Sequence, residues 1–170
     1  MSVFPDPDSF RTFVEKNFSA LASFARSVLG NDLDAEDIAQ DALVLLYRRR
    51  AGLRPEGSPR AYLYRITLRL CLARRRREAR REAISTLFAP LLRQEVPPAS
   101  EPVDSWFRSL TVRQAAIAHL YFAEDFDAGE IAERLRIAPS TVRVQLKRIR
   151  SRLRRLHGAG PASERCSDVP

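Results

Sequence analysis

Apolar residues recur at steps of three and four positions along most of the chain, the spacing that places them on one face of an α-helix. One such stripe covers residues 10–29 and stops at Gly30, a residue typical of a helix C-terminus. A second stripe begins at Ile38. It follows the acidic residues Asp34, Glu36 and Asp37, where negative charge favours a helix N-terminus. A third begins at Pro59 and continues until a run of arginines starts at Arg74. No strand pattern appears, so the sequence predicts an all-α protein.

The C-terminal part of the chain has the pattern of a helix-turn-helix. Asp127 and Glu130 have the spacing of a capping box at the start of a first helix, and Pro139 fits the first position of a second. The residues expected to point inward are Ile131, Leu135, Ile137, Val142, Leu146, Ile149 and Leu153. The opposite face of the second helix carries Ser140, Arg143, Val144 and Lys147. Such a face is free to enter the major groove of DNA.

A proline-rich run at residues 96–102 separates these two parts, because proline lacks the amide donor and forces its predecessor into extended geometry. The sequence therefore predicts two small helical domains joined by a Pro-containing linker. The expected divisions are residues 1–82, a linker at 83–105, residues 106–156, and a disordered tail at 157–170. A further short amphipathic segment is expected before the proline-rich run, from the apolar residues Ile84, Leu87, Phe88, Leu91 and Leu92.

Charge narrows the choice of partner. The chain has 29 Lys and Arg against 21 Asp and Glu, a net charge of +8 that favours a polyanion. Residues 134–155 contain basic side chains and no acidic one, which supports DNA binding by the second helix. The arginine run at 74–81 follows Tyr62 and Tyr64, and aromatic rings beside arginines suit stacking on unpaired bases. The run is equally compatible with a solvated helix end, and Tyr62 with a place in the core.

Other classes of function find little support. The chain has only two cysteines, Cys71 and Cys166, which lie far apart in the sequence, and only two histidines. Neither a disulfide framework nor a zinc site is therefore expected. No phosphate-binding, hydrolase or metalloprotease motif occurs, and we expect no catalytic or metal site, no cofactor and no small-molecule substrate. No signal peptide or membrane-spanning run is present, and the apolar faces of the basic helices are needed for cores. The protein is therefore expected to be cytoplasmic and without a membrane partner.

Taken in order, these features resemble the bacterial sigma-70 family of RNA polymerase initiation factors, specifically the extracytoplasmic-function (ECF) group that has only regions 2 and 4. The likeness to region 2 rests on residues 34–41 (D-A-E-D-I-A-Q-D) and 59–63 (P-R-A-Y-L). The likeness to region 4 rests on residues 114–122, 130–135 (E-I-A-E-R-L) and 141–148 (T-V-R-V-Q-L-K-R). It implies a promoter-specificity subunit that binds core RNA polymerase and directs initiation at the promoter minus-10 and minus-35 elements.

The resemblance also implies three sets of binding residues. The polymerase-binding set is Asp34, Asp37, Gln40, Asp41, Leu43 and Leu46. The minus-10 set is Arg60, Tyr62, Arg65, Arg69, Arg74, Arg75, Arg76 and Arg77. The minus-35 set is Ser140, Thr141, Arg143, Val144, Lys147 and Arg148. Beyond these sets, the arginines expected to contact phosphates are Arg150, Arg152, Arg154 and Arg155.

The chain departs from the family pattern at four positions, one of which is Thr111, where many members have Pro after the equivalent of Leu110. Many members have Asn and Asp where this chain has Arg69 and Ala73, and the turn position often held by Gly is Arg136. Because many relatives are silenced by an anti-sigma protein, the partners to test are core RNA polymerase, promoter DNA and an anti-sigma factor. The alternative is a stand-alone helix-turn-helix regulator, which would normally dimerise to read paired half-sites.

Overall fold

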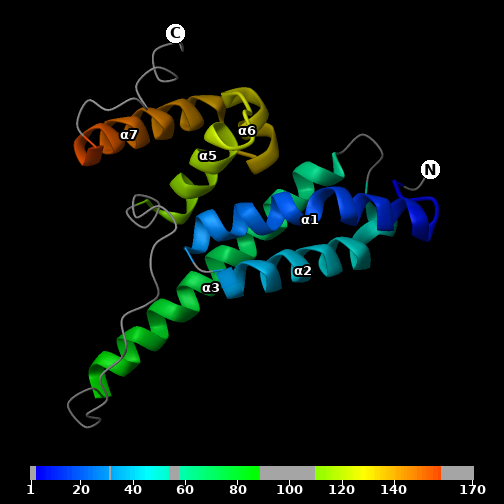
Figure 1. The fold of residues 1–170 in the computed structure, drawn as a ribbon, viewed down its shortest axis with the longest axis horizontal. Helices are drawn as coiled ribbons and strands as arrows, with labels where there is room; N and C mark the ends of the chain where they lie inside the picture. The colour runs from blue at the N-terminus through cyan, green and yellow to red at the C-terminus, as the bar shows by residue number, and fades with distance from the viewer. Residues whose placement is uncertain (1–2, 31, 54–57, 89–109, 158–170) are drawn as a thin grey trace.

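A computed structural model describes residues 3–30, 32–53, 58–88 and 110–157. All regular structure within these ranges is helical, as the sequence predicts. Helices α1, α2 and α3 form an N-terminal bundle, and α5, α6 and α7 pack against it (Figure 1). The proline-rich run and the C-terminal tail, about which the sequence made predictions, lie outside the described residues.

Helices α1 (Pro7–Leu29) and α2 (Asp32–Arg49) lie side by side (Figure 1). The Asp6 side chain caps α1 by accepting a hydrogen bond from the Ser9 backbone N–H at 2.7 Å. Gly30 ends the helix with φ 73°, a left-handed conformation in which a side chain would be strained. The predicted stop at Gly30 is thus confirmed. A short 3-10 turn, η1 (Arg50–Gly52), follows α2.

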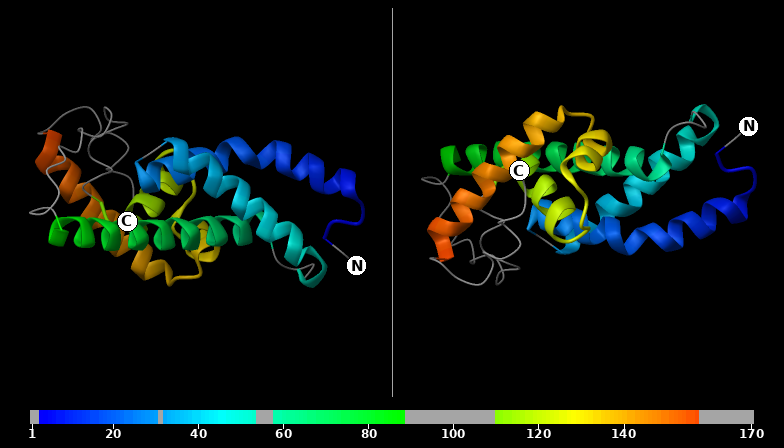
Figure 2. Two further views of the ribbon diagram at one scale, coloured as in Figure 1. Left: turned by 90° about the horizontal axis from the view of Figure 1, so that it is seen from below. Right: turned by 90° about the horizontal axis from the view of Figure 1, so that it is seen from above.

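Helix α3 (Pro59–Phe88) begins at the predicted proline and continues well past the end of the bundle (Figure 2). It includes residues 84–88, so the separate amphipathic segment expected there is wrong for those residues; Leu91 and Leu92 lie outside the described residues. Arg, Glu and Ala dominate this part of the helix, and all three are strong helix formers. From Arg75 to Thr86 nearly every side chain is exposed, including Ile84 at 58%.

The C-terminal part consists of α5 (Val112–Phe122), α6 (Ala128–Leu135) and α7 (Pro139–His157). Thr111 and Gln114 form a capping box at the start of α5. Asp127 and Glu130 form the predicted one at the start of α6, with backbone-to-side-chain distances of 2.8 and 3.0 Å. Two neighbouring short helices therefore each begin at a defined residue.

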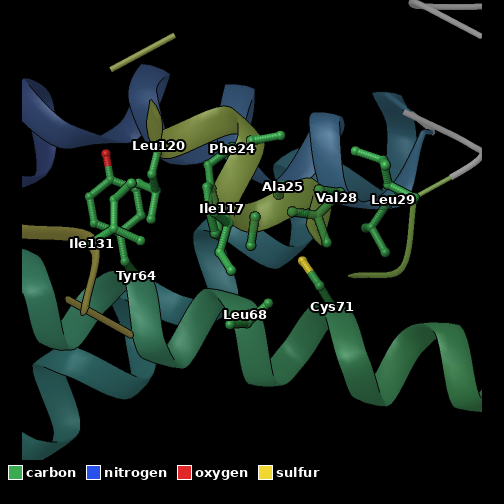
Figure 3. Packing of buried hydrophobic residues seen from close by; sticks show 14 of the residues in the cluster. Phe24, Ala25, Val28, Leu29, Tyr64, Leu68, Cys71, Ile117, Leu120 and Ile131 are labelled. Atoms are coloured by element: carbon green, nitrogen blue, oxygen red, sulfur yellow. The ribbon is translucent and has the colours of Figure 1, made fainter. Parts of the chain in front are cut away.

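Two apolar clusters hold the structure together. The smaller one joins α1, α2 and α3, and its buried members are Leu21, Ala22, Ala39, Ala42, Leu43, Leu46, Leu63 and Ile66. The larger one combines side chains from α1 and α3 with side chains from α5, α6 and α7 (Figure 3). The N-terminal bundle and the C-terminal part thus share one core instead of each closing on itself.

Candidate nucleic-acid interface

Helix α7 presents one apolar and one basic face. Val142, Leu146 and Ile149 are buried, with exposed fractions of 0%, 5% and 0%, and they pack into the larger core. The minus-35 set lies on the other side, and every one of its members is exposed: Ser140, Thr141, Arg143, Val144, Lys147 and Arg148. The predicted division of the helix into an inner and an outer face is confirmed. An outer face of this kind can enter a major groove while the inner face keeps the helix in place.

The turn between α6 and α7 depends on a backbone conformation that is unusual for arginine. Arg136 adopts φ 53° and ψ 53°, and its backbone N–H lies against the carbonyl oxygens of Ala132 and Glu133. The Ile137 N–H also bonds the Ala132 carbonyl, at 3.0 Å. The family resemblance places glycine at this position, and glycine would adopt the left-handed geometry more readily because a Cβ is disfavoured there.

Helix α5 supports α7 from behind. The Gln114 side chain donates to the side-chain amide oxygen (Oε1) of Gln145 at 3.1 Å, and Arg150 donates to the Tyr121 hydroxyl at 3.0 Å. Arg150 is half-buried and its guanidinium lies over the Tyr121 ring. The expectation that Arg150 is an exposed phosphate contact is therefore wrong, because α5 holds this side chain. Arg152, Arg154 and Arg155 are exposed.

The residues of the minus-10 set lie along α3 in two different environments. Arg69, Arg75, Arg76 and Arg77 are exposed. Near the start of the helix, Tyr62 is half-buried, its hydroxyl accepting a hydrogen bond from Arg49 at 2.9 Å. The other three, Arg60, Arg65 and Arg74, are half-buried and bonded to other parts of the protein. The sequence could not separate these two groups, because the bonding partners are distant along the chain.

Arg74 joins the minus-10 set to the polymerase-binding set. Its Nε donates to a carboxylate oxygen of Asp34 at 3.2 Å, and its Nη2 pairs with the other oxygen. The Asp34 side chain is only 14% exposed. The expectation that Asp34 offers its carboxylate to polymerase is therefore wrong, because the carboxylate is already paired with the Arg74 guanidinium. This ion pair instead joins the start of α2 to α3.

The polymerase-binding set divides according to the faces of α2. Asp37, Gln40 and Asp41 are exposed, whereas Leu43 and Leu46 are buried at 6% and 0%. The two leucines cannot contribute an apolar surface, because helical spacing turns them toward α1 and α3. Val44 and Tyr47 are the exposed apolar residues of this helix, at 47% and 43%. Sequence reasoning missed them, although they follow Asp37 and Gln40 at helical steps.

The described residues contain no group of three or more His, Cys, Asp or Glu that could hold a metal ion. Within the same ranges, no helix combines the length and apolarity needed to cross a membrane. Cys71 is a free thiol in the larger core, and burial raises its pKa to about 12. Its side chain extends from α3 toward Val28 of α1 (Figure 3).

Together, the helix-turn-helix and its exposed basic face define a two-part helical DNA-binding protein. Two family models match the chain: Sigma-70 region 2 over residues 13–81 and Sigma-70, region 4 over residues 103–153. The protein belongs to the sigma-70 family and is a promoter-specificity subunit of RNA polymerase. The match over residues 13–81 covers the N-terminal bundle, which a stand-alone helix-turn-helix regulator would not require.

Individual relatives agree with this assignment. Two strains of Mycobacterium tuberculosis, Erdman and H37Rv, have an ECF RNA polymerase sigma factor, SigM, that is 27% identical over 162 residues, covering 90% of this chain and 79% of the relative. The sigma factor RpoE from Bartonella quintana, solved with the anti-sigma factor NepR, has the same fold: TM-score 0.68, 22% identity, 88% of this chain and 97% of that one. CnrH, solved with the cytosolic domain of CnrY, has a TM-score of 0.67 and 25% sequence identity to this chain. The match covers 89% of this chain and 89% of CnrH.

Proposed function

We propose that this sigma factor uses three separate surfaces, one for each binding partner in initiation. The outer face of α7 would read the minus-35 element, α3 would hold the minus-10 element, and the exposed face of α2 would dock on core polymerase. The observation that supports this assignment most strongly is the exposed, mainly polar and basic face of α7 opposite a face on which Val142, Leu146 and Ile149 are buried. We retain residues 1–82 and 106–156 as the two functional regions, with α3 extending into the linker.

At the minus-35 element, the side chains differ in the contact they can make. Arg143 lies in the first turns of α7 and can bind a guanine edge with two parallel hydrogen bonds, which is a base-specific contact. Val144 is 48% exposed and can contact a thymine methyl group. Arg152 and Arg154 lie further along the helix, where charge alone can bind phosphates.

At the minus-10 element, α3 needs no catalytic group. Strand opening can be driven by binding of unpaired bases and phosphates, with Tyr62 offering a ring for stacking and the exposed arginines offering charge. Arg65 lies over the Tyr62 ring at 5.5 Å, an arrangement that adds a cation to the stacking surface. Because binding alone can open the strands, we infer that the protein has no enzymatic activity of its own. We also infer that it acts in the cytoplasm, where polymerase and DNA are found.

The surface on α2 combines charge with apolar area. Asp37, Gln40 and Asp41 are exposed beside Val44 and Tyr47, so this face can form ion pairs at its acidic end and apolar contacts at the other. The Tyr47 ring is held in place by Phe10, at 5.0 Å between ring centroids, and by the Arg50 guanidinium, at 3.7 Å from the ring centroid. An anti-sigma factor, by analogy with the solved relatives, is a further proposed partner.

The docking surface is tested by Asp37→Arg. We expect the variant to bind core polymerase more weakly in a pull-down or titration, because it reverses the charge at the acidic end of the surface. Glu15→Arg is the matched control, since Glu15 is exposed on α1 and the substitution changes the net charge equally. Equal binding by wild type, variant and control would rule out this face of α2 as the docking surface.

A further inference from the structure

Three consecutive arginines, Arg48, Arg49 and Arg50, span the end of α2 and the start of η1. None of them belongs to the three binding sets that the family resemblance implies. Consecutive residues of a helix point in different directions, so neighbouring side chains can reach different parts of the structure. Arg49 reaches α3, whereas Arg50 turns back along α2. The two side chains therefore contact two different surfaces of the proposed function.

Arg49 holds the aromatic ring that we propose for stacking on unpaired bases. Its Nη1 donates to the Tyr62 hydroxyl at 2.9 Å, across the contact between α2 and α3. Tyr62 is half-buried and packs against the smaller apolar cluster, and the Arg65 guanidinium lies 5.5 Å from the centroid of its ring. The hydroxyl and the ring thus each have a partner within the bundle, and the ring is held in one orientation.

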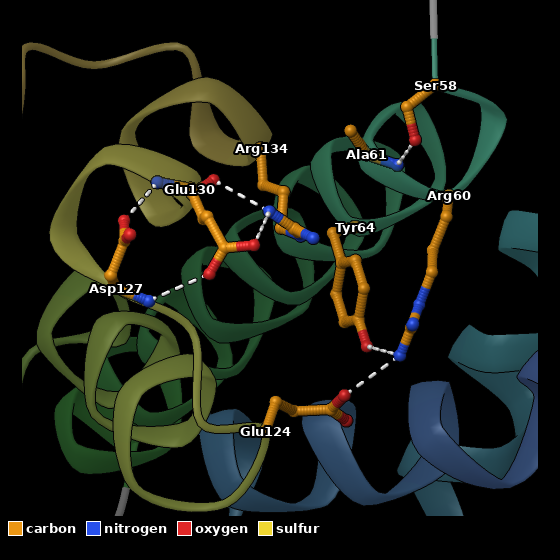
Figure 4. Close-up of polar contacts among 8 residues, drawn as sticks. All are labelled: Ser58, Arg60, Ala61, Tyr64, Glu124, Asp127, Glu130 and Arg134. Atoms are coloured by element: carbon orange, nitrogen blue, oxygen red, sulfur yellow. Dashed lines mark hydrogen bonds and ion pairs between the residues drawn. The ribbon is translucent and has the colours of Figure 1, made fainter.

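Another tyrosine of α3 shows the same kind of pair inside the core. Tyr64 is 1% exposed, and its hydroxyl lies 3.5 Å from the Arg60 guanidinium, which also donates to Glu124 at 2.9 Å (Figure 4). A ring that is buried to this degree has no free face for a base. The hydrogen bond between Arg49 and Tyr62, by contrast, is exposed. Of the two pairs, only the one that contains Arg49 can serve a binding partner.

Arg50 holds an aromatic ring of the proposed polymerase-docking surface. Its guanidinium lies 3.7 Å from the centroid of the Tyr47 ring, and its Nη1 donates to the Tyr47 backbone carbonyl at 2.8 Å. Phe10 of α1 contacts the same ring, and Phe4 packs edge-on against Phe10 at 5.1 Å between ring centroids. Tyr47 nevertheless remains 43% exposed. A ring that is fixed and still accessible is typical of an anchor residue in a protein interface.

Fixing a ring in advance strengthens binding without a new contact to the partner. A mobile side chain loses conformational entropy when it is immobilised in a complex, and a side chain already held in its bound orientation avoids most of that loss. Arg49 restrains Tyr62 through a hydrogen bond. Arg50 restrains Tyr47 through a backbone hydrogen bond and a cation over the ring.

We propose that Arg49 and Arg50 are positioning residues, each of which orients one aromatic ring of a different binding surface. Arg49 orients Tyr62 for unpaired bases of DNA, and Arg50 orients Tyr47 for core polymerase. The inference rests on the proposed roles of the two rings. It assigns separate partners to two adjacent residues of the same type, so each residue is the natural control for the other.

The first test compares the same substitution at the two adjacent positions. Arg49→Gln and Arg50→Gln remove one cation each, and Arg11→Gln, at an exposed site on α1, reports the general effect of that loss. Each full-length variant is titrated against core polymerase and against a fluorescent single-stranded oligonucleotide of random sequence.

Relative to Arg11→Gln, we expect Arg49→Gln to weaken oligonucleotide binding about fivefold and Arg50→Gln to weaken core binding about threefold. Each variant should match the Arg11→Gln control with the other partner. Losses that do not differ between the two variants would overturn the inference.

A double-mutant cycle separates positioning from charge. Tyr62→Phe keeps the ring and removes the hydroxyl, so it should weaken oligonucleotide binding, and adding Arg49→Gln should then cost no more than Arg11→Gln does. Likewise, Arg50→Gln should have no further effect on core binding once Tyr47→Ala has removed the ring. Fully additive losses would show that the two arginines act through charge alone, and would overturn the inference.

Deleting each ring tests the proposed function separately. Tyr62→Ala should weaken oligonucleotide binding, and Tyr47→Ala should weaken core binding. If the ring deletions have these effects and the arginine variants do not, the positioning inference is wrong and the proposed function stands. If a ring deletion leaves its partner's affinity unchanged, the proposed role of that ring is wrong, and the inference fails with it.

Discussion

At the scale of single residues, the role of a side chain depends on which face of its helix it occupies and on what lies opposite. Arg143 and Arg150 are both basic residues of α7, yet Arg143 is exposed and Arg150 is held by Tyr121. On α2, Asp37 is exposed, whereas Asp34 is paired with Arg74. Charge type is visible in the sequence, but pairing across forty positions is decided by tertiary packing and is not.

The proposed base contact of Arg143 gives a prediction for DNA binding. Arg143→Ala should weaken binding to the minus-35 element by about 1–3 kcal/mol and relax the preference for one base pair, because a bidentate contact is lost. Arg154→Ala should instead weaken all sequences alike and lower the salt dependence of binding by about one phosphate contact. Binding measurements over a range of salt concentrations and base substitutions distinguish the two. Identical behaviour of the two variants would contradict the assignment of Arg143 to base reading.

The backbone of Arg136 gives a prediction for stability. Arg136→Gly should raise the free energy of unfolding by roughly 0.5–1 kcal/mol, because glycine adopts the left-handed conformation without the Cβ penalty. Arg136→Gln retains the Cβ while removing the charge, so it should raise the free energy of unfolding much less than Arg136→Gly does. Denaturant unfolding of the three proteins measures the effect. A gain from Gln as large as that from Gly would show that charge, and not backbone strain, is responsible.

At the scale of helices, periodicity predicts most of the structure. The start of α3 at Pro59, the end of α1 at Gly30 and the capping box of α6 are all readable from local residues, because each depends on neighbours within four positions. The continuation of α3 through residue 88 was missed, since apolar periodicity suggested a new segment although no helix breaker precedes it. The exposed pair Val44 and Tyr47 was not predicted, because the acidic motif of residues 34–41 does not by itself indicate which face of α2 is exposed.

The loop after α5 gives a prediction for pH dependence. His119, and then Arg60, hold the pKa of Glu124 below its ordinary value of 4.5, against the opposing effect of burial. A carboxyl group with a lowered pKa stabilises the folded state fully above its ordinary pKa, and this contribution disappears as the pH falls through the lowered value. The stability difference between wild type and Glu124→Gln should therefore shrink as the pH falls below about 4.5. A difference that grows in acid, measured by thermal unfolding, would contradict this sign.

At the scale of the whole molecule, the main feature is that regions 2 and 4 share a core. The sequence contains one signal for this, the run A-A-I-A-H-L at residues 115–120, in which only His119 is polar and which as a helix requires cover from two directions. It could not identify the covering surface, because the contacts of Arg60 with Glu124 and of Ser27 with His119 join residues 64 and 92 positions apart. The same packing engages Arg60 and Arg65 of α3 and leaves the outer face of α7 exposed.

The central claim is that this chain confers promoter choice on core RNA polymerase through regions 2 and 4. It is tested most directly by in vitro transcription from a library of promoter fragments, using core enzyme with and without the purified protein. The account predicts transcripts from a defined subset of fragments that share one pair of sequence elements, and loss of that subset with Arg143→Ala. Transcripts that are the same with and without the protein would contradict it.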